Sequence, residues 1–156
     1  MRVLITGLIV IVSGSIVSPP LLMKGRGGRA TCMGGTVAAA STGLEGSINT
    51  TDEQFFIFKA KTATLWVPYT SVNLLEYGQK VSRRFAMAVL ISPTLLLSKA
   101  RKHFLTVGYT DHEGRQQAVV FRVHKDDIRS VLVALEVKTG LKVQFQDEEA
   151  RKAGKG

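Results

Sequence analysis

Hydrophobic and polar residues alternate most regularly between residues 103 and 124. Within 103–109, and again within 117–124, large apolar residues recur at every second position, so one face of each segment is hydrophobic. A period of two is the pattern of a half-buried β-strand. The residues between the two segments include Asp111 and Gly114, residue types that favour tight turns. The pattern therefore predicts a β-hairpin over 103–124.

After the hairpin, apolar residues recur at helical spacing and would form an apolar stripe along one face of a helix. The stripe consists of Ile128, Val131, Leu132 and Leu135. Asp126 or Asp127 suits the N-cap position, where a carboxylate meets free N–H groups and the positive end of the helix dipole. Gly140 suits the position just beyond the last helical residue. The pattern predicts one amphipathic helix over 126–139.

Shorter apolar segments predict further strands. They lie at 36–40, 54–59, 62–67, 71–77 and 141–145. The second and third are rich in the aromatic and β-branched residues that strands favour, and Pro68 indicates an end or an edge for the third. A longer apolar run over 81–91 is interrupted by Pro93 and resumes at 95–97. It is too short to span a bilayer, which leaves buried strands or an interfacial hairpin as its interpretations.

The N-terminal segment 1–23 is interpreted as a hydrophobic leader. One basic residue precedes about ten mostly apolar ones, as in a signal peptide, and Ser13 and Ser15 suit cleavage after Ser15. If Pro19 and Pro20 are included, the segment reaches the length of a membrane anchor. The basic residues that follow it would then keep the rest of the chain in the cytoplasm. The expected localisation is exported or membrane-associated. A cytoplasm-facing anchor and a misassigned start remain as alternatives.

Composition divides the rest of the chain. Residues 24–33 are rich in glycine and arginine without periodicity and predict a linker. Residues 34–146 are expected to form the folded domain, and residues 147–156 mix charges with alanine and glycine and predict a flexible charged tail. The total length of 156 residues fits one domain. The single cysteine, Cys32, excludes an internal disulfide and a cysteine-based zinc site.

The net charge of +9 is concentrated around the apolar run 85–97. A basic segment around an apolar one suits anionic lipid headgroups. The candidate membrane or partner contacts are Arg83, Arg84, Lys99, Arg101 and Lys102. Two alternatives remain, namely buried strands with solvated basic ends and self-association of two copies through 86–97. Nucleic acid is less favoured, because single-strand binders also carry stacking aromatics and only Phe85 lies in the run.

The order of predicted elements is similar to that of a pleckstrin-homology-like domain of the bacterial or GRAM-related kind. One part of the resemblance is the segment 65–72, LWVPYTSV, which joins two predicted strands. In it, an apolar residue is followed by Pro-Tyr, two further residues and another apolar residue. The other part is the predicted hairpin and helix that follow. The stretch from 74–80 through 99–105 also resembles an uncharacterised bacterial family of this architecture. Together these similarities cover residues 34–146.

The resemblance implies a mainly β (α+β) fold. In it, a strongly bent antiparallel sheet forms a partial barrel, and one C-terminal amphipathic helix caps an open end. Two departures limit what it implies about ligands. The only tryptophan, Trp66, lies in a strand and not in the C-terminal helix, and Lys59 is the only basic residue in 36–59. A general lipid or protein contact is therefore implied, without a specific phosphoinositide site.

No constellation of residues predicts catalysis or a bound cofactor. A catalytic site needs a nucleophile, a base and an electrophilic stabiliser in one place. His103 and His124 lie at the ends of the predicted hairpin strands and can approach each other, but two histidines without a further ligand are weak evidence for a metal. Solvated strand-end histidines are the simpler interpretation. We expect no catalytic, cofactor-binding or metal-binding residue.

The expected function is a non-catalytic binding or scaffolding module. Its expected partner is an anionic membrane surface or an envelope protein. A self-associating structural domain is the alternative, and a basic nucleic-acid-binding protein is the less favoured one.

Overall fold

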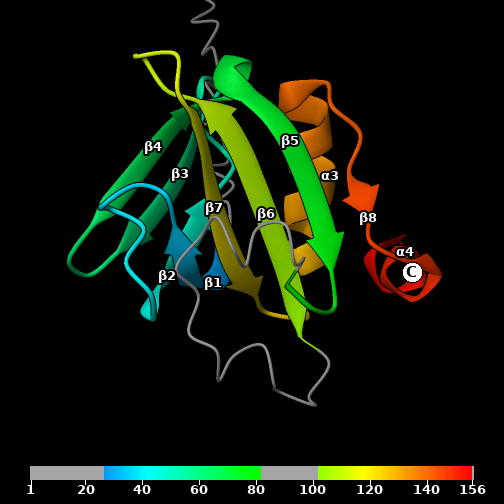
Figure 1. Ribbon diagram of the computed structural model, residues 1–156. Helices are drawn as coiled ribbons and strands as arrows, with labels where there is room; N and C mark the ends of the chain where they lie inside the picture. Colours follow the sequence, from blue (N-terminus) through cyan, green and yellow to red (C-terminus); the bar gives the residue numbers. More distant parts are fainter. Residues whose placement is uncertain (1–26, 82–101, 156) are drawn as a thin grey trace, which may run out of the picture.

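The computed structural model describes residues 27–81 and 102–155 (Figure 1). The strands are β1 (Gly28–Gly35), β2 (Leu44–Asn49), β3 (Phe55–Ala60), β4 (Thr64–Pro68), β5 (Val72–Gly78), β6 (His103–Thr110), β7 (Gln116–Val123) and β8 (Gln144–Phe145). The helices are η1 (Tyr69–Ser71), α3 (Ile128–Thr139) and α4 (Glu148–Lys155). The fold of the described residues is thus mainly β with a smaller helical part, as the sequence pattern predicts.

The strands form one sheet in the order β4-β3-β2-β1-β7-β6-β5-β8. Neighbouring strands are antiparallel, except that β8 runs parallel to β5. The two edge strands, β4 and β8, do not pair with each other, so the sheet is open. The predicted hairpin over 103–124 is confirmed as β6 and β7, and Gly114 in its turn has a φ of 78°.

The sheet curls around a shared hydrophobic core. Phe121 of β7 packs against Phe56 and Phe58 of β3, with ring centroids 5.6 and 4.9 Å away. Strands β2 and β1 separate β3 from β7 in the sheet order, so these rings meet only because the sheet bends. All three rings are buried. The curl brings inward-facing residues of distant strands together.

Helix α3 confirms the predicted amphipathic helix and buries its apolar stripe in this core. Its buried residues are Ile128, Val131, Leu132 and Leu135. Gly140 follows the helix with a φ of 71°, the left-handed conformation that glycine adopts readily. Asp127 occupies the N-cap position but makes no side-chain bond to the helix. Its carboxylate accepts hydrogen bonds from Arg29 instead, so the predicted capping role of the side chain is wrong.

The linker prediction over 24–33 is wrong from Gly28 onward. Strand β1 lies in the middle of the sheet, between β2 and β7, and buries Cys32. Its glycines are required by close packing. A Cβ on Gly28 would lie 2.5 Å from Val131 of α3, and one on Gly35 would lie 2.4 Å from the Cβ of Ala40.

Two further boundaries differ from the sequence pattern. The predicted strand over 36–40 is a turn, in which the Ala40 N–H donates to the Val37 carbonyl oxygen at 2.9 Å. Strand β2 was not predicted, because its sequence, LEGSIN, carries only two large apolar residues. The strands predicted at 54–59, 62–67 and 71–77 correspond to β3, β4 and β5 within a few residues.

The tail prediction over 147–156 is also wrong, because helix α4 packs against the domain. Ala150 is fully buried, and a Cβ on Gly154 would lie 2.6 Å from the ring of Phe145. The Asp147 carboxylate accepts a hydrogen bond from the Ala150 N–H at 2.6 Å, which caps the helix. Figure 1 shows α4 beside β8 at the side of the sheet.

The predicted leader, 1–23, and the apolar segments 81–91 and 95–97 lie outside the described residues, apart from Val81. Within 27–81 and 102–155, no helix has the length and apolar character needed to span a membrane.

Candidate functional site

Of the five predicted contact residues, the structure describes only Lys102. Arg83, Arg84, Lys99 and Arg101 lie outside the described residues. Lys102 directly precedes β6 and lines a surface hollow of about 610 Å³, which we call the basic hollow. The cationic residues that line it are Arg29, Lys102, Arg122 and Lys125. The hollow also contains His103, His124 and one acidic residue, Glu45.

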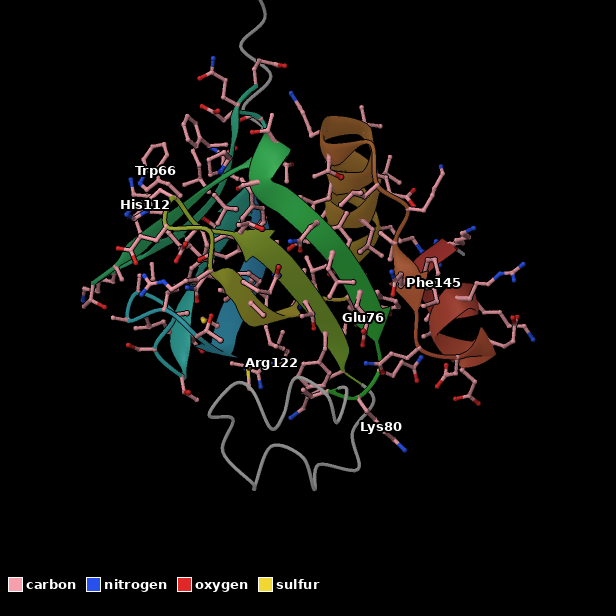
Figure 2. The ribbon with its side chains drawn as sticks, turned by 45° about the horizontal axis from the view of Figure 1, so that its top comes forward. Trp66, Glu76, Lys80, His112, Arg122 and Phe145 are labelled. Atoms are coloured by element: carbon pink, nitrogen blue, oxygen red, sulfur yellow. The ribbon has the colours of Figure 1, made fainter. Side chains whose placement is uncertain are left out.

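Four strands bring these residues together at one end of the sheet. Thr31 of β1 lies opposite Arg122 of β7 on one side and Glu45 of β2 on the other. His103, the first residue of β6, lies opposite Val123 of β7. Arg122 donates a hydrogen bond from Nη2 to the Thr31 hydroxyl at 3.2 Å. Figure 2 shows Arg122 projecting beyond the strands at this end of the sheet.

Arg29 is partly neutralised by acidic residues at the start of α3. Its Nε lies 3.0 Å from Asp127 Oδ2 and its Nη2 lies 3.5 Å from Asp126 Oδ2. Burial raises the pKa of Asp127, but the hydrogen bonds and charge of Arg29 outweigh that effect and leave this pKa below its usual value. Lys102 and Lys125 have no ion-pair partner among the described residues. The hollow therefore keeps a positive excess.

The two histidines of the hairpin ends line the same hollow. The sequence pattern suggested only that they can approach each other. Burial, reinforced by repulsion from His124, lowers the pKa of His103. His103 Nδ1 and Tyr77 Oη share a hydrogen bond of 2.5 Å, and the two rings stack with centroids 6.0 Å apart. Within the described parts of the chain, no group of three or more histidine, cysteine, aspartate or glutamate residues could hold a metal ion.

A second hollow, of about 860 Å³, was not predicted and lies at the opposite end of the hairpin. We call it the aromatic hollow. The lining residues used in the argument below are Phe55, Trp66, Pro68, Tyr109, His112 and Arg115. Trp66 is 57% exposed because it is an outward-facing residue of β4, whose buried and exposed residues alternate. The sequence shows that alternation, but it does not show that the hairpin turn lies close to Trp66. Trp66 and His112, both labelled in Figure 2, line this hollow from β4 and from the hairpin turn.

Asp111 organises the turn that borders the aromatic hollow. Its carboxylate accepts hydrogen bonds from the backbone N–H groups of Glu113 and Arg115, both at 2.9 Å. It also accepts bonds from Arg115 Nε at 3.1 Å and from Gln117 Nε2 at 2.7 Å. These bonds, led by the one from the Arg115 N–H, hold the pKa of Asp111 well below its ordinary value. The predicted role of Asp111 as a turn residue is confirmed.

Asp111→Asn is expected to lower the melting temperature at neutral pH and to have little effect in strong acid. The folded-state pKa is depressed, so the carboxylate stabilises the fold above its ordinary pKa of 3.8, and this contribution is lost as the pH falls further. Thermal unfolding of both proteins at neutral and strongly acidic pH measures the difference. Glu45→Gln, at an exposed side chain of β2 that has no ion-pair partner among the described residues, is the control. The prediction is contradicted if the variant and the wild type differ in melting temperature by the same amount at both pH values.

No protein-family model matches the chain, and no curated protein matches it. The basic hollow and the aromatic hollow are therefore the two candidate sites from which function is inferred.

Proposed function

We propose that this protein is a non-catalytic binding module that contacts an anionic membrane surface through the basic hollow. The observation that carries the proposal is the convergence of Arg29, Lys102, Arg122 and Lys125 on one concave surface at one end of the sheet. A basic residue close to an anionic membrane contributes about 1 kcal/mol to binding. Several such residues on one surface provide affinity without requiring a specific headgroup.

The arrangement of elements supports the pleckstrin-homology-like part of the proposal. The resemblance implies a bent, open antiparallel sheet followed by an amphipathic helix. Strands β1 to β7 form such a sheet, and α3 follows β7 directly. Helix α3 contacts both β1 and η1, the short helix that joins β4 to β5, and thereby packs its apolar stripe inside the curl.

The sequence places further positive charge close to Lys102 along the chain. Lys80 follows β5 and Lys102 precedes β6. Because Gly78 of β5 pairs with Phe104 of β6, these two lysines lie at the same end of the sheet. Lys99 and Arg101 are within three residues of Lys102 in the sequence. These neighbours support a contact surface centred on the basic hollow.

The test is co-sedimentation of the full chain with vesicles. Binding is expected to vesicles of phosphatidylcholine mixed with phosphatidylglycerol, to be absent with phosphatidylcholine alone, and to weaken as salt screens the charges. The double variant Lys102→Ala/Lys125→Ala should bind the anionic vesicles about 30-fold more weakly, because it removes two charges worth about 1 kcal/mol each.

The double variant Lys142→Ala/Lys152→Ala is the matched control, because it also removes two charges from exposed lysines, and neither of them lines the hollow. It tests whether net charge alone explains the effect. Equal weakening by the control and by Lys102→Ala/Lys125→Ala would overturn the role of the hollow. Failure to bind either vesicle at low salt would overturn the membrane proposal itself.

A further inference from the structure

We propose that the aromatic hollow is a second binding site, which takes an extended proline-rich segment of a partner protein. The site is built on an aromatic pair. The rings of Trp66 and Phe55 meet edge to face, with centroids 5.9 Å apart and an interplanar angle of 81°. Pro68 and Tyr109 line the same hollow. Its volume of about 860 Å³ is large enough for a ligand of several residues.

Three side-chain acceptors around the hollow, those of Asp111, Gln116 and Gln117, are already occupied. The Asp111 carboxylate accepts four N–H groups from its own turn. Gln117 Oε1 accepts a hydrogen bond from the Thr36 hydroxyl, and Gln116 Oε1 accepts one from Asn73 Nδ2. These three side chains offer little to a ligand that presents many N–H or O–H donors.

The donors, in contrast, have spare capacity. Trp66 Nε1–H has no hydrogen-bond partner among the described residues. Arg115 uses Nε on Asp111 and Nη2 on Glu113, which leaves Nη1 available within the same part of the chain. The site therefore suits a ligand with exposed acceptors, few donors and an apolar body.

Proline-rich segments have this chemistry. Proline has no backbone N–H, and its carbonyl oxygen remains an accessible acceptor in the extended polyproline II conformation. Its ring packs on exposed aromatic side chains, and aromatic-lined grooves are a recurrent way of recognising such segments. A carbohydrate fits less well, because each hydroxyl brings a donor along with its acceptor.

Charge also separates this site from the basic hollow. Arg115 lies 3.1 Å from Asp111 Oδ2 and 2.6 Å from Glu113 Oε2, so one cation faces two carboxylates. The surface is not positively charged and does not suit an anionic lipid headgroup. The inference is therefore independent of the membrane proposal, and either can fail without the other.

The test measures the fluorescence anisotropy of a labelled peptide of about ten prolines, long enough to form polyproline II, titrated with the full chain. Saturable binding is expected. Trp66→Ala should weaken it about tenfold or more, as for an aromatic residue at the centre of an interface. Val137→Ala should leave it unchanged, because Val137 is also an exposed apolar residue but lies on α3 and does not line the hollow.

A second measurement does not depend on any variant. Trp66 is the only tryptophan, so its emission in the wild-type chain should shift to shorter wavelength as the unlabelled proline peptide covers it. A peptide of alternating glycine and serine of the same length should cause no shift. Thermal unfolding of Trp66→Ala checks that the variant remains folded.

Three results would overturn the inference. The first is no saturable binding of the proline peptide up to about 1 mM, a concentration that corresponds to only about 4 kcal/mol of binding free energy. The second is undiminished binding by a folded Trp66→Ala variant. The third is saturable binding of a chitin oligosaccharide without binding of the proline peptide, which would identify the site as one for carbohydrate.

Discussion

Replacing Phe121 by alanine is expected to lower the free energy of unfolding by about 3–5 kcal/mol. Phe121 is fully buried on β7 and contacts Phe56 and Phe58 across the curl of the sheet. Its removal leaves a cavity between two strands that no hydrogen-bond ladder connects. Neighbouring side chains can fill that cavity only if the curl changes. Denaturant-induced unfolding, followed by circular dichroism, measures the loss.

Val137→Ala is the control for this experiment. Val137 is 76% exposed on α3, and its truncation should change the free energy of unfolding by no more than about 0.5 kcal/mol. A Phe121→Ala loss as small as that of the control would mean that β3 and β7 do not share one core. The curl described above would then be wrong.

Deleting residues 148–156 is expected to lower the free energy of unfolding by about 2 kcal/mol or more. The deletion removes α4, whose Ala150 is fully buried, and uncovers the rings of Tyr77 and Phe145, which meet edge to face at 5.9 Å. It also removes Lys155, whose ammonium lies 5.5 Å from the centroid of Phe145. Unfolding in denaturant should show a lower midpoint than that of the full chain.

Arg151→Ala provides the control, because it removes one exposed charge of α4 and keeps the helix and its buried residues. It should change the free energy of unfolding by no more than about 0.5 kcal/mol. If the deletion is as mild as this single substitution, α4 contributes no packing. The C-terminal residues would then behave as the flexible tail that their composition predicts.

The elements that could be predicted from sequence are those whose pattern is local. The hairpin of β6 and β7 and the apolar stripe of α3 each show their periodicity within about a dozen residues, and both are confirmed. Strand β1 could not be predicted in this way. Its glycines are typical of a linker, but Gly28 is needed because the side chain of Val131, about a hundred residues later in the sequence, packs against it.

The candidate sites were less accessible to sequence reasoning than the fold. A search for contiguous charge finds Lys102, but Arg29, Arg122 and Lys125 join it only because β1, β6 and β7 end at the same place. The aromatic hollow has no sequence signal beyond one tryptophan on an edge strand. Its other lining residues come from β3 and β4, from η1, from the hairpin and from the residues that follow β1.

The position of β1 also constrains the order in which the domain can form during synthesis. Thr31 and Arg122, which meet where β1 pairs with β7, are 91 residues apart in the chain. Until β7 leaves the ribosome, β2 is the only neighbour in the sheet that β1 can pair with, so the other edge of β1 has no partner among the described strands. Closing so long a loop is entropically slow, and exposed strand edges attract other chains. Early release of this nascent chain, before α3 is complete, would therefore favour aggregation over folding.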